Sequence, residues 1–505
     1  MPTNNRVLII KRNLIEAHNK FIRTLAAEKT LSFSDGNPLP DDSYQTVLLL
    51  FPKENFEGDI ALKIKAFIKY GKIVGINSTG KQKIIGLQQL IAELFSKNIK
   101  SIEKIIKSAF WLAFAFKFYI LRTRPTVGVT QGRIKVLHLV KSGKLSGITI
   151  MVRNLLECVD KQIFEPSVCF LEGGQFVDEF RKMGFEVMVI NKRDYDIDTV
   201  AILKKLMEEK QIKILHAHEF KESIYGRFAA GMAGVPVNIA HFHGGGKGDW
   251  RKLVPFGRLS LRFTDAVLAL TGLMKKEISD GYYGYRADPM KIFRFPNCVD
   301  TELFLPKDKA TAKSQFNIPD GILVIGMTAR LSVEKGHEVL FKALKHLKDL
   351  KLEFLCLLIG DGPIEGLLKE KTKEMGISDY VVFMGERRDI HELLPVFDIY
   401  IQPSIWHGES FSLSTVEAMA CEVPVIASRI GGLPEVVDHG ICGFLFNPED
   451  IDELTGYIKL LLDEPDKAAE MGKNARMKAE RDFSRISFKD RVNRLYFDLL
   501  DMEGH

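Results

Sequence analysis

Two cations stand close to a predicted helix start in the second half of the chain. Arg330 and Lys335 lie in TARLSVEKGHEVL, which continues an apolar strand pattern and carries a glycine just before the helix. Open α/β sheets bind ligands at the carboxyl ends of their strands, and the amides of a helix start attract anions. Two cations in that place are suited to a diphosphate. The same spacing also fits a pair of solvated surface cations.

Two glutamates flank a serine-rich turn in WHGESFSLSTVEAMA. Glu409 precedes the turn, and Glu417 lies inside the helix that follows it. Carboxylates accept hydrogen bonds from pairs of sugar hydroxyls, so Glu409 is suited to a hexose and Glu417 to a ribose. The amides between Ser410 and Leu413 would then lie near phosphate. The alternative is that both glutamates are charges near a helix start, where the helix dipole favours them.

Four histidines occur in HAHEF and HFHGGG, at the ends of two predicted strands. Alternating histidines can clamp a metal ion, so zinc is one interpretation of this pattern. It is not favoured, because no carboxylate or cysteine completes a ligand set at a convincing spacing. His216 and His241 alternate with buried neighbours, and we expect both to pack inside or to support other groups.

The elements that must position these residues form two series of short apolar strands alternating with amphipathic helical segments. The first series begins at Arg133 and the second at Gly321. This alternation predicts an α/β protein with two doubly wound parallel sheets. Segment 295–309 contains two prolines and almost no helical pattern, which predicts an interdomain hinge. An amphipathic helix is expected over about 486–500.

The composition indicates a soluble globular protein of several domains. The chain has 505 residues, of which 46% are hydrophobic and 27% charged, and this balance excludes wholesale disorder, collagen-like repeats and a polytopic membrane protein. Six scattered cysteines without a CxxC pair predict neither a disulfide framework nor structural zinc. Because the first residues lack a secretory pattern, a reducing cytoplasm is the expected location.

The net charge of +6 is unevenly distributed along the chain. Residues 1–133 hold 21 Lys and Arg against 10 Asp and Glu, whereas the remaining residues hold 50 against 55. Segment 60–124 combines its lysines with aromatic residues, and a basic amphipathic helix of this kind can lie in an anionic membrane interface. Packing against the rest of the protein, with the lysines solvated, is the alternative. We do not expect nucleic acid as a partner, because no RNA- or DNA-binding module is recognisable.

Several motifs together resemble a known family. TARLSVEKG, FMGE followed by DIYIQPS, ESFSLSTVEAMA, PVIAS and GGLPEVVDHGICGFLF occur in the order and spacing of the nucleotide-sugar domain of family 4 retaining glycosyltransferases. The resemblance covers roughly 133–505 and is strongest over 321–446. It implies the GT-B fold, in which two Rossmann-like domains face a cleft.

The resemblance also implies a domain layout. Residues 133–304 would form the acceptor-side domain and 305–485 the nucleotide-sugar-binding domain, while 486–505 would form a helix that crosses back to the first domain. Residues 1–132 fall outside the resemblance. We expect them to form a small α/β accessory module, with strands over 6–12, 46–51 and 72–77 and basic amphipathic helices from 84 to 124.

In this family, the matching residues have distinct roles. Arg330 and Lys335 would bind the donor diphosphate and stabilise the leaving group, Glu409 would hold sugar hydroxyls, and Glu417 would bind the ribose. Preorganised cations in a closed cleft stabilise the charge of a departing nucleoside diphosphate without a metal. No DxD-type motif stands out at a strand end, so we expect no metal and no cofactor, the nucleotide sugar being a co-substrate.

Further donor contacts come from loops. Gly385 and Glu386 lie where the family's backbone reads the base. Gly147 matches the glycine-rich loop that approaches the donor phosphate, although the usual glycine pair is absent and a plain tight turn is the alternative. His218 best matches the family's histidine near the reacting sugar, with His243 second. The remaining expected contacts are Ser410, Phe411, Ser412 and Leu413.

The resemblance implies a retaining, metal-independent hexosyltransferase. Its donor would be a nucleotide diphosphate sugar, with UDP favoured over GDP, and its acceptor a glycan or lipid-linked molecule of cell-surface polysaccharide or glycolipid synthesis. The acceptor hydroxyl would enter on the leaving-group side, where the donor phosphate takes its proton. The basic segment would hold the enzyme peripherally at the inner face of the cell membrane. A non-catalytic subunit of a polysaccharide assembly complex and a nucleotide-sugar epimerase of related fold remain alternatives.

Overall fold

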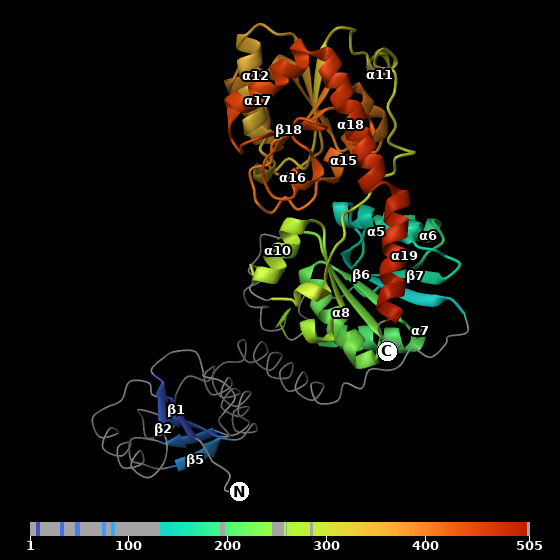
Figure 1. Ribbon diagram of the computed structural model, residues 1–505, viewed down its shortest axis with the longest axis vertical. Coiled ribbons are helices and arrows are strands. Elements are labelled where there is room, and N and C mark those ends of the chain that lie inside the picture. Colours follow the sequence, from blue (N-terminus) through green and yellow to red (C-terminus); the bar gives the residue numbers. More distant parts are fainter. Residues whose placement is uncertain are drawn as a thin grey trace. The chain divides into compact units, whose positions relative to one another are not determined.

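The computed structural model divides into two compact units, Met1–Arg122 and Thr123–His505 (Figure 1). The first unit is described by the backbone of its strands alone. In the second unit, the described residues are 132–191, 197–244, 257–258, 260–282 and 286–501. Within this described part of the chain, no helix is long and apolar enough to cross a membrane.

The first unit contains a five-stranded sheet of order β2-β1-β3-β4-β5, in which only β5 is antiparallel to its neighbour. Its strands are β1 (Val7–Ile10), β2 (Leu31–Ser34), β3 (Thr46–Leu50), β4 (Ile73–Ile76) and β5 (Gln82–Ile85). The apolar patterns predicted β1, β3 and β4. The helical pattern expected from residue 84 is wrong for residues 84–85, which belong to β5. The rest of that pattern lies outside the described residues.

The second unit begins with a fully parallel seven-stranded sheet of order β12-β11-β10-β9-β6-β7-β8. Most of its strand residues are buried, as expected for parallel strands covered on both faces. Successive strands run outward in opposite directions from β6 and β9, so the topological switch point lies between these two strands. The strands are β6 (Ile134–Ser142), β7 (Phe164–Glu172), β8 (Glu186–Val189), β9 (Ile214–His218), β10 (Val237–Phe242), β11 (Ala266–Ala269) and β12 (Ile292–Arg294).

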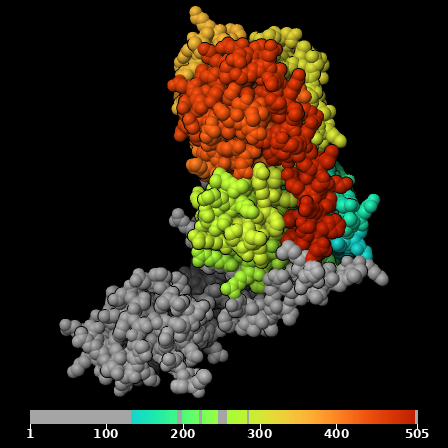
Figure 2. Space-filling model, in the orientation of Figure 1, coloured from blue at the N-terminus to red at the C-terminus, as the bar shows by residue number. Residues whose placement is uncertain are grey.

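Helices cover both faces of this sheet. The helices are α5 (Gly147–Cys158), α6 (Phe176–Lys182), α7 (Ile197–Lys210), α8 (Phe220–Ala233) and α10 (Gly272–Asp280). The face formed by Val136, Ile214 and Ile239 packs against α5 and against a helix from the far end of the chain, α19 (Arg485–Asp501). Figure 2 shows this red C-terminal helix lying along the surface of the first sheet's domain.

A second parallel sheet follows, of order β15-β14-β13-β16-β17-β18. Its strands are β13 (Leu323–Thr328), β14 (Phe354–Ile359), β15 (Val381–Gly385), β16 (Ile399–Gln402), β17 (Val425–Ser428) and β18 (Gly443–Phe446). Two apolar clusters cover its faces, one with α12, α13 and α17, the other with α11, α15 and α18. The helices are α11 (Lys309–Gln315), α12 (His337–Asp349), α13 (Glu365–Glu374), α14 (Ile390–Leu393), α15 (Leu413–Ala420), α16 (Leu433–Val436), α17 (Ile451–Asp463) and α18 (Pro465–Phe483).

The switch point of the second sheet lies between β13 and β16. The segments that follow these two strands carry Lys335 and Glu409, so both residues start from the ligand-binding edge of the sheet. The prediction of two doubly wound, Rossmann-like domains is therefore confirmed, and the chain has the two-domain architecture of the GT-B fold.

Candidate active site

Lys335 and Glu409 form an ion pair at the carboxyl edge of the second sheet. Lys335 ends a short 3-10 turn after β13, and its Nζ lies 2.7 Å from Oε2 of Glu409. Glu409, in the loop between β16 and α15, is 9% exposed. Gly336 has a φ of 73°, and a Cβ there would lie 1.8 Å from the Pro403 carbonyl oxygen. Only glycine therefore lets the lysine loop close onto the segment that leads to Glu409.

A row of polar side chains along β16 fixes the Glu409 carboxylate. Ser404 Oγ donates to Glu409 Oε2 at 2.7 Å, and Gln402 Nε2 donates to Ser404 Oγ at 2.9 Å. The Tyr400 hydroxyl lies 3.1 Å from Gln402 Oε1. These residues recur every second position and so share one face of the strand. Sequence analysis missed this row, although polar residues at alternate positions of a buried strand were the available signal.

The other expected cation, Arg330, is exposed in the loop after β13. Among the described residues, no carboxylate pairs with its guanidinium group. A guanidinium group at the edge of the sheet, five residues before Lys335, keeps all its donors available for an anionic ligand. The structure thus keeps one expected cation paired with a carboxylate and the other open to solvent.

The serine-rich turn becomes the start of α15. Ser412 caps the helix, because its Oγ accepts a hydrogen bond from the Thr415 amide at 3.4 Å; Thr415 Oγ1 also donates to it, at 2.8 Å. The first amides of a helix have no partner inside it, so those of Leu413 and Ser414 are suited to a phosphate. A Cβ built on Gly147 would lie 3.9 Å from the Leu413 side chain, which places the start of α5 opposite the start of α15.

Gly147 itself is the first residue of α5 and not the middle of a tight turn. Ser146 caps the helix, and Thr149 completes a capping box with it. Serine and threonine therefore cap a helix start that lies opposite the start of α15, and the phosphate role of Gly147 stays a prediction.

The side chains of Ser410 and Phe411 join the two domains. Ser410 Oγ donates to the His243 carbonyl oxygen at 3.0 Å. Phe411 packs against apolar clusters of both domains, and its ring lies 5.4 Å from that of Phe483. These side chains hold the loop in place, so the backbone of the turn is the part available to a donor.

Glu417 lies on α15 and is partly exposed. Desolvation raises the pKa of its carboxyl group to about 7, while the positive charge of Arg153 on α5 partly offsets that rise. Gly385, at a φ of 67°, ends β15 at the same edge of the sheet, and Glu386 directly follows it. No described contact links these two residues to the Lys335–Glu409 pair, and their role in reading a base stays a prediction.

Glu435 on α16 also bridges the domains, and sequence analysis did not single it out. Its carboxylate accepts hydrogen bonds from the amides of Gly272 and Leu273 at 2.8 and 2.9 Å, at the start of α10. Arg294 Nε lies 3.1 Å from the same carboxylate. A pocket between α10 and the loop that carries Glu409 lies beside this contact. The sequence signal for this contact was the motif GGLPE, whose last residue is Glu435.

Five histidines form one stacked cluster on three neighbouring strands of the first sheet. His138 lies on β6, His216 and His218 lie on β9, and His241 lies on β10, with His243 directly after it. The strand register places the first four side chains on one face, and His243, two residues after His241, stacks on the same cluster. Neighbouring ring centroids are 4.3 to 5.5 Å apart. Sequence analysis missed His138, because a single histidine in a buried strand carries no spacing signal.

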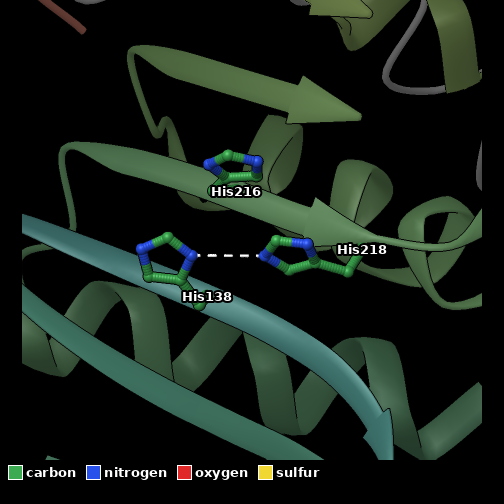
Figure 3. A group of neighbouring side chains, drawn as sticks. All are labelled: His138, His216 and His218. Carbon is green, nitrogen blue, oxygen red and sulfur yellow. Dashed lines mark hydrogen bonds between the residues drawn. The ribbon is translucent and has the colours of Figure 1, made fainter. Parts of the chain in front are cut away.

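Hydrogen bonds arrange the rings in two rows, and the first row ends at His243, directly after β10. His138 Nδ1 lies 3.2 Å from His218 Nε2, and His218 Nδ1 lies 3.1 Å from His243 Nε2 (Figure 3 shows the first of these contacts). His138 and His218 have no exposed surface. His243 is partly exposed, so it is the member of this row that can meet a ligand.

The second row runs back to the C-terminal helix. The Tyr496 hydroxyl on α19 lies 2.8 Å from His216 Nδ1, and His216 Nε2 lies 3.0 Å from His241 Nδ1. All three residues are fully buried. The expectation that His216 and His241 pack inside the domain is therefore confirmed.

Burial keeps the five rings neutral. Desolvation lowers the pKa values of His138 and His243 to about 3. It also lowers the pKa values of the other three, with a further contribution from neighbouring imidazoles. A neutral ring donates from one nitrogen and accepts at the other, so each row requires an ordered set of tautomers.

The cluster contains enough histidine ligands for a metal ion, but no anionic ligand to balance the charge of one lies beside it among the described residues. Two groups of three, His138 with His216 and His218, and His218 with His241 and His243, have ligand nitrogens within 4.8 Å of one another. No carboxylate or cysteine of the described residues joins either group. A divalent cation would therefore bring uncompensated charge into a buried place, and five neutral rings hydrogen-bonded to their neighbours are less costly.

Comparison with known proteins identifies the family. The model described as Glycosyltransferase Family 4 matches residues 145–303, and that of Glycosyl transferases group 1 matches residues 308–478. A GDP-mannose-dependent monoacylated alpha-(1-6)-phosphatidylinositol monomannoside mannosyltransferase of Corynebacterium glutamicum is 30% identical over 50% of this chain and 68% of its own. The chain belongs to the family 4 glycosyltransferases.

Other relatives of this glycosyltransferase match over longer stretches. The UDP-Gal:alpha-D-GlcNAc-diphosphoundecaprenol alpha-1,3-galactosyltransferase of Escherichia coli is 27% identical, over 74% of this chain and 98% of its own. Among solved structures, Anabaena HepE in complex with UDP matches with a TM-score of 0.65 and 22% identity, over 72% of this chain and 100% of its own. Sucrose-phosphate synthase from Thermosynechococcus elongatus matches with a TM-score of 0.62 and 19% identity, over 73% and 100%. These structural likenesses confirm the fold.

Proposed function

We propose that this glycosyltransferase moves a hexose from a UDP-sugar, with retention of anomeric configuration, to a glycan or lipid-linked acceptor of cell-surface polysaccharide or glycolipid synthesis. The observation that carries the proposal is the Lys335–Glu409 pair, 2.7 Å apart at the strand ends, beside the free amides that begin α15. A relative named for a UDP-galactose donor and a diphosphoundecaprenol acceptor supports the choice of substrates, as does the UDP complex of HepE.

In the proposed reaction, the cations act on the leaving group. Lys335 and Arg330 bind the diphosphate and stabilise the negative charge that develops as the bond to the sugar breaks. Glu409, already held by Ser404, accepts hydrogen bonds from the hexose hydroxyls, and Glu417 accepts them from the ribose. The acceptor hydroxyl enters on the face that the diphosphate leaves, and a phosphate oxygen takes its proton.

Thermal stabilisation across a panel of UDP-, GDP- and ADP-sugars tests the donor assignment. We expect UDP-sugars to stabilise the protein, and we expect this effect to be lost in Lys335→Ala and Glu417→Ala. Lys345→Ala is the matched control, because Lys345 is an exposed residue of α12 that pairs with Asp349 one turn away. Donor stabilisation that persists in both site variants would refute the site assignment.

Product analysis tests the chemistry. Mass spectrometry and the anomeric NMR signals of the product should show one added hexose in the donor's configuration, with a rate that chelators leave unchanged. Inversion, or loss of activity on chelation that added metal restores, would contradict the proposal. A non-catalytic subunit would release no UDP, and an epimerase would release interconverted sugar.

We further propose a cytoplasmic enzyme held at an anionic membrane surface through residues 60–124. The excess of lysine in this segment supports the idea. The full-length protein should co-sediment with vesicles containing anionic lipid and not with neutral ones. Substitution of the segment's lysines by glutamine should weaken this binding, and equal sedimentation of both proteins would contradict it.

A further inference from the structure

Glu409 offers a ligand only one of its two carboxylate oxygens. Lys335 Nζ and Ser404 Oγ each lie 2.7 Å from Oε2, and among the described residues no other group hydrogen-bonds to this carboxylate. Oε1 is therefore the oxygen left for a sugar hydroxyl. Glu409 also lines the pocket between its own loop and α10. The contacts that hold Oε2 thus decide which oxygen can meet a ligand in this pocket.

The carboxylate sets the direction of the hydrogen bonds behind it. Because a carboxylate can only accept, Ser404 gives its proton to Glu409, and the serine oxygen accepts from Gln402 Nε2. This requirement orients the amide of Gln402. Its nitrogen must face Ser404, so its Oε1 faces Tyr400 on the other side, 3.1 Å from the hydroxyl.

Tyr400 extends this chain of hydrogen bonds to the start of α15. Its hydroxyl lies 3.1 Å from Gln402 Oε1, 3.2 Å from the Thr328 carbonyl oxygen and 2.8 Å from Ser414 Oγ. The first two atoms can only accept, and the hydroxyl has one proton, so Ser414 gives its own proton to the tyrosine oxygen. Ser414 is the second residue of α15. One directed chain therefore runs from this helix start to Glu409.

The middle of the chain is enclosed inside the domain. Tyr400 and Ser404 have no exposed surface, and Gln402 is 1% exposed. None of these three side chains has a buried polar atom without a partner. A buried polar network whose members are all satisfied is rigid, so the chain can hold Oε2 of Glu409 in one place.

We propose that Tyr400 and Gln402 are positioning residues for sugar transfer, which hold the Glu409 carboxylate at a fixed place relative to the start of α15. They act through Ser404 and do not touch the substrate. The chain fixes the spacing between the oxygen that binds the hexose and the amides suited to phosphate, and such spacing decides how well bound groups react. The inference rests on the proposed function for the identity of the ligand. The direction of the chain rests on the free protein.

Calorimetric titration with UDP, UDP-glucose and UDP-galactose separates positioning from folding. Tyr400→Phe and Gln402→Leu should weaken binding of the UDP-sugar about tenfold, the loss expected when a hydrogen bond to a charged group is disturbed. Affinity for UDP should stay unchanged. Hydrolysis of the UDP-sugar should fall about tenfold to 100-fold, because the hexose is misplaced. Tyr496→Phe is the matched control, since Tyr496 is also fully buried but bonds to His216 in the other domain.

A double-mutant cycle tests whether the chain acts through Glu409. In a Glu409→Ala background, Tyr400→Phe should cause no further loss of UDP-sugar affinity, because the carboxylate that it positions is gone. Ser404→Thr, which keeps the hydroxyl, should retain more UDP-sugar affinity than Ser404→Ala. In the ligand-free protein, 15N NMR should show that the side-chain amide signals of Gln402 shift in Glu409→Ala.

Three results would overturn the inference. The first is an equal loss of UDP and UDP-sugar affinity in Tyr400→Phe, which would indicate a structural role alone. The second is a full effect of Tyr400→Phe in the Glu409→Ala background. The third is the same loss of UDP-sugar affinity in Tyr496→Phe. If the wild type binds no sugar nucleotide, the proposed function fails, and the Gln402 amide signals of the free protein still decide whether the chain runs to Glu409.

Discussion

Glu409 and Glu417 are both acidic residues of the second domain, but their surroundings give them different tasks. Glu409 is held by Lys335 and Ser404 through one carboxylate oxygen, so its position is set before a ligand arrives. Glu417 is desolvated, and the charge that partly offsets this comes from Arg153 in the other domain. The hydroxyls of a bound ribose would supply the hydrogen bonds that its ionised form needs.

Nucleotide affinity should therefore depend on pH through Glu417. In the proposed complex the ionised carboxylate would accept hydrogen bonds from the ribose, so binding would favour ionisation, whereas the free group has a pKa of about 7. Affinity for UDP should rise from pH 6 to pH 8 and fall by up to about tenfold per unit below pH 7. Calorimetric titration at several pH values measures this. The dependence should vanish in Glu417→Gln and persist in Glu370→Gln, a change at an exposed residue of α13.

At the scale of elements, the first turn of α10 depends on a side chain of the other domain for the hydrogen bonds of its amides. Thr271 caps the helix through Met274, while Glu435 satisfies the amides of Gly272 and Leu273. A helix start leaves its first amides unpaired unless side chains or ligands meet them. The two domains therefore share a contact that stabilises α10 only while they lie together, which couples a local helix end to closure of the cleft.

Glu435→Ala should expose this coupling. We expect the change to lower stability by about 1 kcal/mol, the usual contribution of a cap, and to speed amide hydrogen exchange at Gly272 and Leu273. Exchange elsewhere in the first sheet should not change. Glu370→Ala, on the exposed surface of α13, is the control. Unchanged exchange at the two amides would show that Glu435 does not cap α10.

At the scale of the whole molecule, the cluster of five histidines makes the fold sensitive to acid. Each ring is neutral in the folded protein and binds a proton in the unfolded chain below the ordinary pKa of about 6.5. Because the unfolded state then binds more protons, stability is fully present above pH 6.5 and is lost as pH falls. The loss continues until the rings titrate in the folded state, at about pH 3 for His138 and His243.

The expected slope is steep. Each histidine contributes about 1.4 kcal/mol per pH unit well below pH 6.5, so five contribute about 7 kcal/mol per unit, which is comparable with the whole stability of a domain. We expect cooperative unfolding of the first sheet's domain between about pH 6 and pH 4.5, followed by circular dichroism. His138→Phe should reduce the slope by about one fifth, whereas substitution of the exposed His346 by glutamine should leave it unchanged. Equal slopes in all three proteins would contradict this account.

Much of the architecture could be predicted from local patterns. Buried parallel strands appear as continuous apolar runs and their helices as amphipathic segments, so the two doubly wound sheets follow from periodicity alone. The edge strands β2, β5 and β12 were missed because short strands with mixed polarity resemble loops or helix starts. Lys335 and Glu409 could be assigned because strand-end loops in such sheets meet at one edge.

The sequence by itself determined which residues carry charge at the ligand-binding edges and that two Rossmann-like domains present them. The tertiary structure alone decided which of these residues meet. It paired Lys335 with Glu409, brought Glu435 of α16 to the start of α10 and added His138 to the histidines of β9 and β10. It also buried His218 and left His243 partly exposed. Contacts between strands far apart in the chain depend on register and on the opposing domain, and neither is encoded in local spacing.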